Sequence, residues 1–303
     1  MAAELDDLSS FVAIVRAGGF RDAARVSGGS ASSLSEAVRR LEARLGVRLL
    51  HRTTRSIAPT EAGARLFERL SPALAEVRAA LDVVNTFKDR PAGTLRLNVP
   101  ANVARTVLPG IVPAFLTAYP DIRLDVTVED SFVDILASGA DAGIRYEERL
   151  EQDMIAVPIG PRTQRILTAA APAYLAAHGR PAHPQDLLQY ACMRSRFSGG
   201  AIAIWEFERA GEIVRVDPLG PLLVQPGLAC DLLIDAAIAG LGIVHLFEDW
   251  LKPHIASGAL ETVLDDWCEP FSGPILYYSG RRYLPTPLRA FVDFIKAHPF
   301  AER

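Results

Sequence analysis

The chain has 303 residues, of which 50% are hydrophobic and 22% are charged, and its formal net charge is −4. This length corresponds to about two domains at roughly 150 residues each, and the apolar content is sufficient for folded cores. The sequence has no apolar run near the roughly 18 residues that a membrane span needs, and its first ten residues lack the basic and apolar regions of a signal peptide. We therefore expect a cytoplasmic protein of more than one domain, without a membrane anchor.

Charge differs between the two parts of the chain. Residues 1–90 contain 14 Lys and Arg against 11 Asp and Glu, whereas the remaining residues contain 18 against 25. A basic excess favours contact with nucleic acid phosphates, although the position of the charges matters more than their sum. The distribution has the direction expected of a nucleic-acid-binding segment at the N-terminus.

The cysteines and histidines are scattered. Cys192, Cys230 and Cys268 form no CxxC motif, and the six histidines form no HExxH or HxxxH pair. We therefore predict no metal site and no cofactor. Two roles remain open for the cysteines, a redox sensor or reduced thiols that fill small apolar sites, and the expected cytosolic setting favours the second.

Three short helices are predicted near the N-terminus. Apolar residues recur at helical spacing from Leu8 to Val15, and the pair Gly18-Gly19 ends this first helix. A second helix runs from Phe20 to Val26, after which Ser27-Gly28-Gly29 force a tight turn. Ser30 is a suitable N-cap for a third helix.

The third helix has an apolar face and a polar face. Its apolar face, which can pack on the first two helices, carries Leu34, Val38, Leu41 and Leu45, while Ser32, Ser35, Glu36 and Arg39 point outward. Small hydrogen-bonding side chains suit the start of the second helix of a helix-turn-helix, because bulky groups would hold it away from base edges in the major groove. We predict DNA contacts from Ser30, Ser32, Ser33, Ser35 and Arg39.

A basic hairpin is predicted after these helices. Val47 and Leu49 are expected to point inward from one strand and Ile57 from the other. The tip between them offers cations and hydroxyls, which suit phosphate oxygens. An alternative is a small helical domain whose polar face serves solubility alone, but the ordered helix pair, glycine turn, polar helix and basic hairpin favour DNA binding. The predicted phosphate contacts are Arg52, Thr53, Thr54 and Arg55.

This N-terminal block resembles the winged helix-turn-helix of LysR-type transcriptional regulators. Where that family usually has Gln or Pro at the opening of the third helix, this chain has Ala31. The residues that carry the resemblance are Gly19-Phe20, Ala23-Ala24, Ser30, Ser32, Leu34-Ser35, Leu41-Glu42, Leu45-Gly46, Leu49-Leu50, Arg52-Thr53-Thr54-Arg55 and Thr60-Glu61-Ala62-Gly63.

A longer helix is predicted from Thr60 onward. Its apolar residues Leu66, Leu70, Leu74, Val77, Leu81 and Val84 recur at steps of four or three, close to a coiled-coil seam, and Pro72 predicts a kink. The seam can face a second copy of the chain or pack on its own domain. The resemblance implies the first, because this segment is similar to the linker helix that pairs LysR-type subunits. Pro91-Ala92-Gly93 is predicted to be the hinge into the second half.

Beyond the hinge, predicted strands and helices alternate in an α/β pattern. The resemblance implies a periplasmic-binding-protein-like domain of two lobes, with the chain crossing near Gly160-Pro161 and returning near Pro270. The predicted fold is thus α/β with an N-terminal all-α winged helix-turn-helix. The predicted boundaries are 1–62 for the DNA-binding domain, 63–90 for the linker helix and 91–303 for the effector domain, with lobe I at about 94–160 and 270–303 and lobe II at about 161–269.

The second half contains no recognisable catalytic motif. Gly240 and Gly242 do not complete GxGxxG, and neither GxxxxGK[ST] nor GxSxG occurs, so we do not expect an enzyme. A cleft between α/β lobes suits a small anionic or polar molecule, because strand ends and helix N-termini present free N–H groups there. The predicted lining is Pro100, Ala101, Asn102, Val103, Asp130, Ser131 and Arg145 on one side and Arg196, Phe197, Ser198, Gln225, Pro226 and His245 on the other.

Two of these residues have plain structural alternatives. Arg145 can pair with Glu147 or Glu148, and His245 can be a core histidine. The function also has alternatives. We favour a regulator that binds double-stranded DNA as a dimer, or as the tetramer common in the family, and that responds to a small organic effector. A constitutive repressor whose α/β half only oligomerises, or an α/β enzyme with a regulatory N-terminal domain, would fit less of the sequence.

Overall fold

The computed structural model describes the chain except for several short segments. The described residues are 2–27, 29–52, 57–85, 90–129, 139–146, 154–197, 200–225, 230–280 and 284–300. The chain divides into two compact units, which are described separately. The first unit is formed mainly by residues 1–91, and the second by residues 92–132, 142–281 and 287–303.

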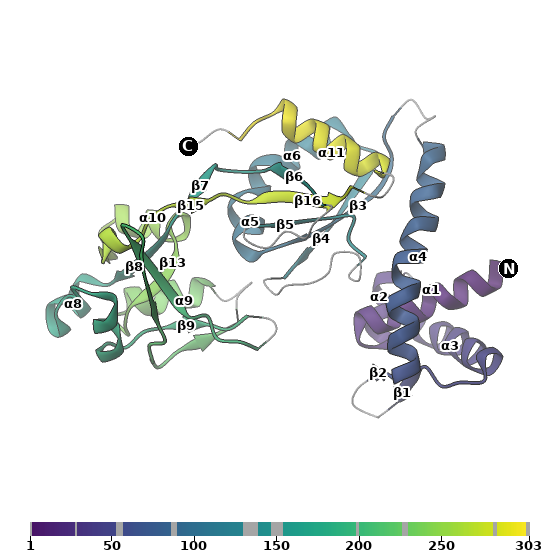
Figure 1. The fold of residues 1–303 in the computed structure, drawn as a ribbon, viewed down its shortest axis with the longest axis horizontal. Helices are drawn as coiled ribbons and strands as arrows, with labels where there is room; N and C mark the ends of the chain where they lie inside the picture. Colours follow the sequence, from purple (N-terminus) through teal and green to yellow (C-terminus); the bar gives the residue numbers. More distant parts are fainter. Residues whose placement is uncertain are drawn as a thin grey trace. The chain divides into compact units, whose positions relative to one another are not determined.

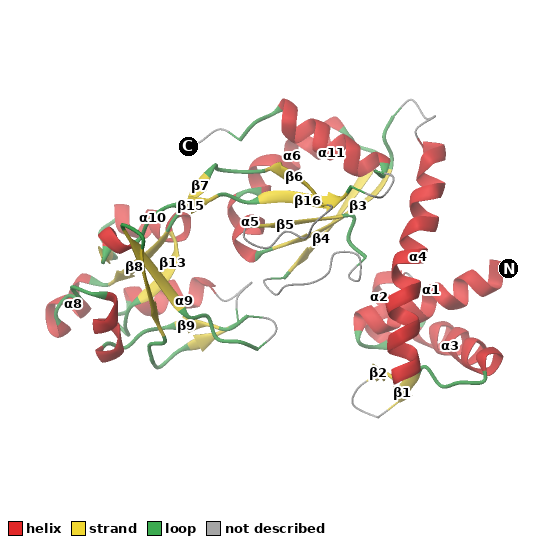
Figure 2. Ribbon diagram, viewed as in Figure 1, coloured by secondary structure: helices red, strands yellow, loops and turns green. Residues whose placement is uncertain are grey.

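In the N-terminal unit, packed helices are joined to a small antiparallel hairpin (Figures 1 and 2). Its elements are α1 (Ala2–Ala17), α2 (Phe20–Ser27), α3 (Ala31–Leu45), β1 (Leu50–Arg52), β2 (Ile57–Pro59) and α4 (Glu61–Asn85). Gly18 and Gly46, which follow α1 and α3, have φ values of 66° and 69°, a left-handed conformation that glycine adopts without steric cost. The core of the unit includes Phe11, Ile14, Leu34, Val38, Leu41, Leu49 and Leu50.

Two residues expected in this core lie on the surface instead. Leu45 and Val47 are each 48% exposed. The buried face of α3 ends at Leu41, and the chain reverses at Gly46, so the residues beside the turn lie beyond the packed part of the helix. Strand β1 begins only at Leu50, so the predicted alternation does not extend back to Val47.

Helix α4 continues through Pro72 without interruption. The first half of its apolar seam packs on its own unit, because Leu74 is buried in the core and Leu66 and Leu70 lie against it. For these residues the intradomain alternative is correct. Val77 is 40% exposed, and the side chains of Leu81 and Val84 lie outside the described residues.

The second unit contains two lobes. Lobe I is built on a five-stranded sheet of order β4-β3-β5-β16-β6, in which β3 is parallel to β4 and β5. Phe115 and Phe291, from two helices of this lobe, have ring centroids 5.0 Å apart in its core. The elements are β3 (Gly93–Val99), α5 (Ala101–Thr106), α6 (Leu108–Ala118), β4 (Ile122–Val128), β5 (Ala142–Arg145), β6 (Met154–Pro158), β16 (Ile275–Ser279) and α11 (Thr286–Ala297).

Lobe II is built around a three-stranded sheet of order β13-β8-β14. A β10–β11 hairpin and a short β9–β12 pair accompany this sheet. The elements are β8 (Ile166–Ala170), α8 (Pro172–His178), the 3₁₀ helix η2 (Pro184–Gln189), β9 (Arg194–Ser195), β10 (Trp205–Arg209), β11 (Glu212–Val216), β12 (Leu223–Val224), α9 (Cys230–Ile238), β13 (Val244–Phe247), α10 (Glu248–Ala256), β14 (Glu261–Val263) and η3 (Asp265–Trp267).

Two short strands connect the lobes. β7 (Thr163–Gln164) carries the chain out of lobe I, and β15 (Phe271–Ser272) returns it. The two strands pair antiparallel, with Phe271 opposite Gln164. Gly273 allows them to approach, since a Cβ there would lie 1.8 Å from the carbonyl oxygen of Pro161. The described connections thus form a narrow double crossing at the junction of the lobes.

Candidate DNA-reading and effector sites

The start of α3 is fixed by two serines. The Ser30 hydroxyl accepts a hydrogen bond from the Ser33 amide at 3.1 Å, and the Ser33 hydroxyl donates to the Ser30 carbonyl at 2.8 Å. A side-chain cap of this kind stabilises a helix by about 1 kcal/mol. Both serines were predicted to contact DNA, and in this structure their hydroxyls hold the helix terminus. Their contact with DNA stays a prediction.

The exposed side of α3 lies opposite its core side. Leu34, Ala37, Val38 and Leu41 are buried. At 3.6 residues per turn, the line diametrically opposite passes through Ser32, Glu36 and Arg39, all three of which are exposed. Ser35 lies at the edge of this line and is half-buried. The predicted contacts therefore share a face, and Glu36 stands at its centre although it was not among them.

Two other arginines of α3 bind an acidic side chain of α1. Asp7, whose side chain is 3% exposed, accepts from Arg40 at 2.6 Å and lies 3.8 Å from Arg44. The hydrogen bond to Asp7 raises the pKa of Arg40. A buried carboxylate needs such partners, because leaving it unpaired would be costly. This cluster fastens α1 to α3.

The hairpin is anchored to α3 by one carboxylate. Oε1 of Glu42 accepts from the backbone amides of Leu49 and Leu50 at 2.8 and 3.1 Å. Thr60 adds a second anchor by donating its hydroxyl to the Arg48 carbonyl at 2.8 Å. The predicted tip contacts, namely the Arg52 side chain, Thr53, Thr54 and Arg55, lie outside the described residues.

Three polar side chains meet at the junction of the lobes. Asn102 lies in α5, Tyr146 follows β5 and Gln164 belongs to β7. The Asn102 amide nitrogen donates to Tyr146 Oη at 3.0 Å and to Gln164 Oε1 at 3.2 Å, and Tyr146 Oη donates to the same Gln164 oxygen at 2.7 Å. Asn102 was predicted, whereas Tyr146 and Gln164 were not, because only the folded chain brings them beside α5.

Two atoms of this cluster, Oδ1 of Asn102 and Nε2 of Gln164, are buried and have no hydrogen-bond partner among the described residues. The residues are only 2% and 6% exposed. Each such atom costs about 1–3 kcal/mol relative to a satisfied one. If the O and N atoms of only one side-chain amide were exchanged, Asn102 and Gln164 would face each other with two acceptors or two donors. The two amide assignments can therefore only be exchanged together. Either consistent assignment leaves one donor and one acceptor free.

Aromatic rings lie beside these amides. The Tyr146 ring is stacked on Phe247 of lobe II, with centroids 6.1 Å apart, and meets Phe271 edge-on at 5.7 Å. Arg105 of α5 also reaches lobe II, where it pairs with Asp231 at 2.6 Å and lies 5.3 Å from the Trp250 ring centroid. The junction thus combines flat apolar surfaces with a buried donor and acceptor.

Arg145 lies near this junction but serves the sheet of lobe I. Its guanidinium is buried, and it donates to the backbone carbonyls of Asn98 and Ile144 at 3.2 and 2.6 Å and to the Asn98 side chain at 2.5 Å. It therefore joins the ends of β3 and β5. The alternative partners Glu147 and Glu148 lie outside the described residues.

Comparison with known proteins gives two family matches that together span most of the chain. Residues 5–64 match the bacterial regulatory helix-turn-helix protein, lysR family, and residues 88–299 match the LysR substrate binding domain. The chain belongs to the LysR family of transcriptional regulators. Family membership assigns DNA binding to the helix-turn-helix of the N-terminal unit, in which α3 follows α2.

Individual relatives agree over nearly the full length. A putative transcriptional regulator of Pseudomonas aeruginosa is 43% identical, with 95% of this chain and 93% of the relative covered. The uncharacterized HTH-type transcriptional regulator YcaN of Escherichia coli is 39% identical over 98% of this chain and 96% of its own. The full-length structure of the Vibrio cholerae virulence activator AphB has a TM-score of 0.68 at 24% identity, covering 97% and 99% of the two chains, and shows the fold alone.

The other predicted effector contacts are distributed as follows. Pro100, Ala101 and Val103 are buried at the start of α5, whereas Arg196, Phe197 and Gln225 are exposed on lobe II. Asp130, Ser131, Ser198 and Pro226 lie outside the described residues. All of these positions stay predictions as effector contacts.

His245 has the surroundings of a core histidine. Its Nδ1 lies 2.9 Å from the Thr168 hydroxyl, and its ring centroid is 5.1 Å from Trp205 and 4.7 Å from Phe207. Burial lowers its pKa to about 3, while a hydrogen bond with the Glu206 backbone opposes this shift. The imidazole is therefore neutral at pH 7, which matches the structural alternative and leaves its effector contact a prediction.

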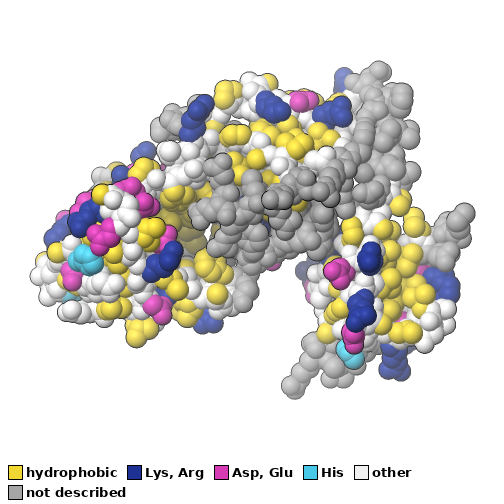
Figure 3. Space-filling model, in the orientation of Figure 1, with side chains coloured by type: hydrophobic (Ala, Val, Ile, Leu, Met, Phe, Trp, Pro, Cys, Tyr) yellow, Lys and Arg dark blue, Asp and Glu magenta, His cyan; other side chains and the backbone are white. Residues whose placement is uncertain are grey.

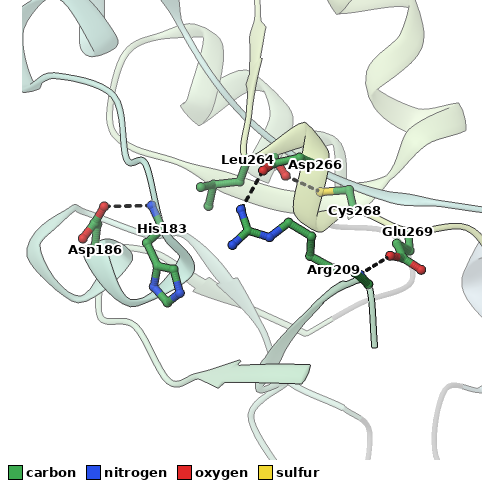
Figure 4. A network of polar contacts seen from close by, with 8 residues as sticks. His183, Asp186, Arg209, Leu264, Asp266, Cys268 and Glu269 are labelled. Atoms are coloured by element: carbon green, nitrogen blue, oxygen red, sulfur yellow. Dashed lines mark hydrogen bonds and ion pairs between the residues drawn. The ribbon is translucent and has the colours of Figure 1, made fainter. Parts of the chain in front are cut away.

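Residues Leu264 to Trp267 lie in a network of polar contacts in lobe II (Figure 4). The Arg209 guanidinium covers the Trp267 ring at 3.9 Å and pairs with Asp266 at 2.9 Å, while Glu269 accepts from the Ala210 amide at 2.7 Å. These contacts attach the β10–β11 hairpin to η3. Acidic and basic side chains are intermixed over the face of this lobe shown in Figure 3.

The three cysteines are buried free thiols. Burial raises the pKa of Cys192 to about 12 and also raises that of Cys268, which disfavours the reactive thiolate. Among the described residues, no three His, Cys, Asp or Glu side chains are grouped to hold a metal ion. No described helix is long and apolar enough to cross a membrane.

Replacing Glu42 tests the anchor of the hairpin. Glu42→Ala would leave the buried amides of Leu49 and Leu50 without their acceptor, so we expect a loss of about 2–3 kcal/mol in the free energy of unfolding and weaker DNA binding. Glu42→Gln retains an acceptor and should lose about 1 kcal/mol or less. Urea unfolding and duplex titration of the full chain measure both effects. Glu68→Ala, on the exposed side of α4, is the control, and equal stability of the Glu42→Ala and control proteins would contradict the assignment.

The buried imidazole predicts a pH dependence of stability. Because its folded pKa lies below the ordinary value of 6.5, the unfolded chain takes up the proton first. The stabilisation is complete above pH 6.5 and falls as the pH drops towards 3, by about 2 kcal/mol at pH 5. His245→Gln should flatten this part of the profile, whereas the exposed His298→Gln should not. Unfolding free energies at pH 5 and pH 7 that change equally in both variants would refute the prediction.

Proposed function

We propose that this LysR-family regulator changes its DNA binding when a small organic effector occupies the junction between the two lobes. The observation that supports the proposal is the buried donor and acceptor left free by Asn102 and Gln164. Satisfying both atoms would recover much of their burial cost, which gives a ligand a specific source of binding free energy. DNA binding itself follows from membership of the LysR family, and the proposal adds that an effector alters it.

The free pair also indicates the chemistry of the effector. A carboxamide offers one acceptor and one donor and so complements both atoms, whereas a carboxylate offers acceptors alone and would face the free carbonyl oxygen. Arg145, the charged residue of the predicted lining on lobe I nearest this cluster in sequence, donates its guanidinium hydrogens to Asn98 and Ile144. The neighbouring rings of Tyr146, Phe247 and Phe271 suit a flat apolar group. The sequence predicted an anionic or polar effector. A flat, uncharged amide complements the free atoms of Asn102 and Gln164 better than an anionic carboxylate does.

One observation favours the constitutive alternative. Tyr146 of lobe I stacks directly on Phe247 of lobe II, so aromatic side chains already occupy part of the junction. A ligand must part these rings or slide beside them to reach Asn102 and Gln164. In the constitutive reading, the rings close the junction permanently and the α/β half serves oligomerisation.

Matched amides and acids distinguish these possibilities. Benzamide and nicotinamide should raise the melting temperature of the full chain more than benzoate and nicotinate, and should change its affinity for a duplex selected from a random library. Gln164→Glu, which replaces the donor by an acceptor, should abolish the amide effect. Gln189→Glu makes the same change on the exposed surface of η2 and should not.

The outcomes separate the effector function from its chemistry. Acids that act as strongly as amides, or an amide effect that survives Gln164→Glu, would refute the amide assignment and leave effector response standing. Failure of amides, acids and a wider metabolite screen to alter either melting temperature or DNA affinity would support the constitutive alternative.

We also propose that the chain binds DNA as a dimer formed through the second half of α4. Val77 continues the apolar seam beyond the part that packs internally, and it is exposed. Val77→Glu should shift the sedimentation profile towards monomer while the unit stays folded, because a charge would be buried in the pair. Ala64→Glu, on the opposite side of the helix, is the control. An unchanged oligomer in the folded Val77→Glu protein would place the interface elsewhere.

A further inference from the structure

The outward line of α3 carries one acidic and one basic side chain. Glu36 and Arg39 are 57% and 65% exposed and lie one turn apart, with Oε2 and Nη1 separated by 3.8 Å. Residues at this spacing have Cβ atoms about 5–6 Å apart, so their side chains can converge on one target. Both point directly away from the buried face formed by Leu34, Val38 and Leu41.

The other polar side chains of α3 near this pair are engaged by groups within the protein. Arg40 and Arg44 of the same helix remain 55% and 41% exposed, but both are engaged by the buried carboxylate of Asp7 on α1. Ser30 and Ser33 cap the helix. On the line opposite the buried face of α3, Glu36 and Arg39 are therefore the long exposed side chains, with Ser32 one turn before Glu36.

A carboxylate in this position is unfavourable for general DNA binding. It faces phosphates and base acceptors of the same charge sign, so it lowers affinity for most sequences. The exception is an exposed amino group, which cytosine N4 and adenine N6 provide in the major groove. Adenine presents its N7 acceptor beside N6, which repels a carboxylate, whereas cytosine does not.

We infer that Glu36 and Arg39 together read one C·G base pair in each half-site of the operator. Glu36 accepts from cytosine N4, and Arg39 donates to O6 and N7 of the paired guanine. The charges of the two side chains match the donor and acceptor halves of this single base pair. The inference rests on the role of α3 as the recognition helix of a LysR-family protein, and it assigns a specificity role to a residue that the sequence pattern left aside.

Selection of duplexes from a random library by the full chain provides the test. The wild-type protein should select C·G at one position of each half-site, and changing that pair should weaken binding by about 5- to 150-fold. Glu36→Ala should lose this preference while retaining the preferences at other positions. Glu36→Gln should shift the position towards A·T, because a carboxamide pairs with adenine N6 and N7. Arg39→Ala should weaken selection at the same position.

The controls separate readout from simple repulsion. Glu68→Gln removes an equal charge from α4 and should leave every base preference unchanged. The affinity for an unrelated duplex, measured at several salt concentrations, reports the general electrostatic effect of the substitution. This affinity should be slightly higher for Glu36→Ala than for the wild-type protein, because a negative charge has been removed. If Glu36→Ala binds all duplexes more tightly with wild-type base preferences, or if the wild-type selection contains no such C·G pair, the inference is wrong. If the wild-type protein selects no duplex at all from the library, DNA binding itself is contradicted.

Discussion

The requirement that buried polar groups find partners governs both functional parts of this protein. At the lobe junction, Asn102, Tyr146 and Gln164 satisfy one another only in part and leave one donor and one acceptor free. Apolar residues could have filled this space without such a cost. The polar cluster lies where β7 and β15 connect the lobes, because Gln164 is itself a residue of β7.

The same requirement selects the side chains that α3 presents. The hydroxyls of Ser30 and Ser33 form hydrogen bonds with backbone groups at the start of the helix, and Arg40 and Arg44 pair with the buried Asp7. The outer face of α3 then presents few polar side chains, and these include the acidic Glu36 and the basic Arg39. The polar side chains that α3 can offer to DNA are therefore fewer than the polar residues in its sequence, because contacts within the fold already engage several of them.

Local patterns in the sequence predicted much of the fold. Helix periodicity and capping residues located α1, α2 and α3, because these signals act within a few residues of one another. Family resemblance supplied the two-lobed domain. The errors at Leu45 and Val47 arose at the end of α3 and just beyond it, since periodicity indicates a face without indicating how far along the chain that face is covered.

The candidate sites were less predictable for a related reason. Gln164 lies 62 positions from Asn102 in the chain, and no local pattern marks it as a partner. Conversely, Arg145 and His245 were chosen because charged and titratable side chains near strand ends suit ligands, yet Asn98 and Thr168 engage them within the fold. A sequence shows which side chains can bind a ligand, but the tertiary contacts determine which of them are already occupied.

The junction contacts differ in the free energy that each contributes. Arg105 joins lobe I to lobe II through Asp231, but the two side chains are 39% and 69% exposed, and such pairs contribute about 0–1 kcal/mol. Its contact with the Trp250 ring is of similar size, about 0.5–1 kcal/mol. The free amide atoms carry about 1–3 kcal/mol each, which equals the coupling free energy typical of allosteric proteins. Helix α5 bears both Arg105 and Asn102. A ligand group that hydrogen-bonds to the free amide atoms would therefore act on the same helix as the Arg105 contacts and would contribute more free energy than they do.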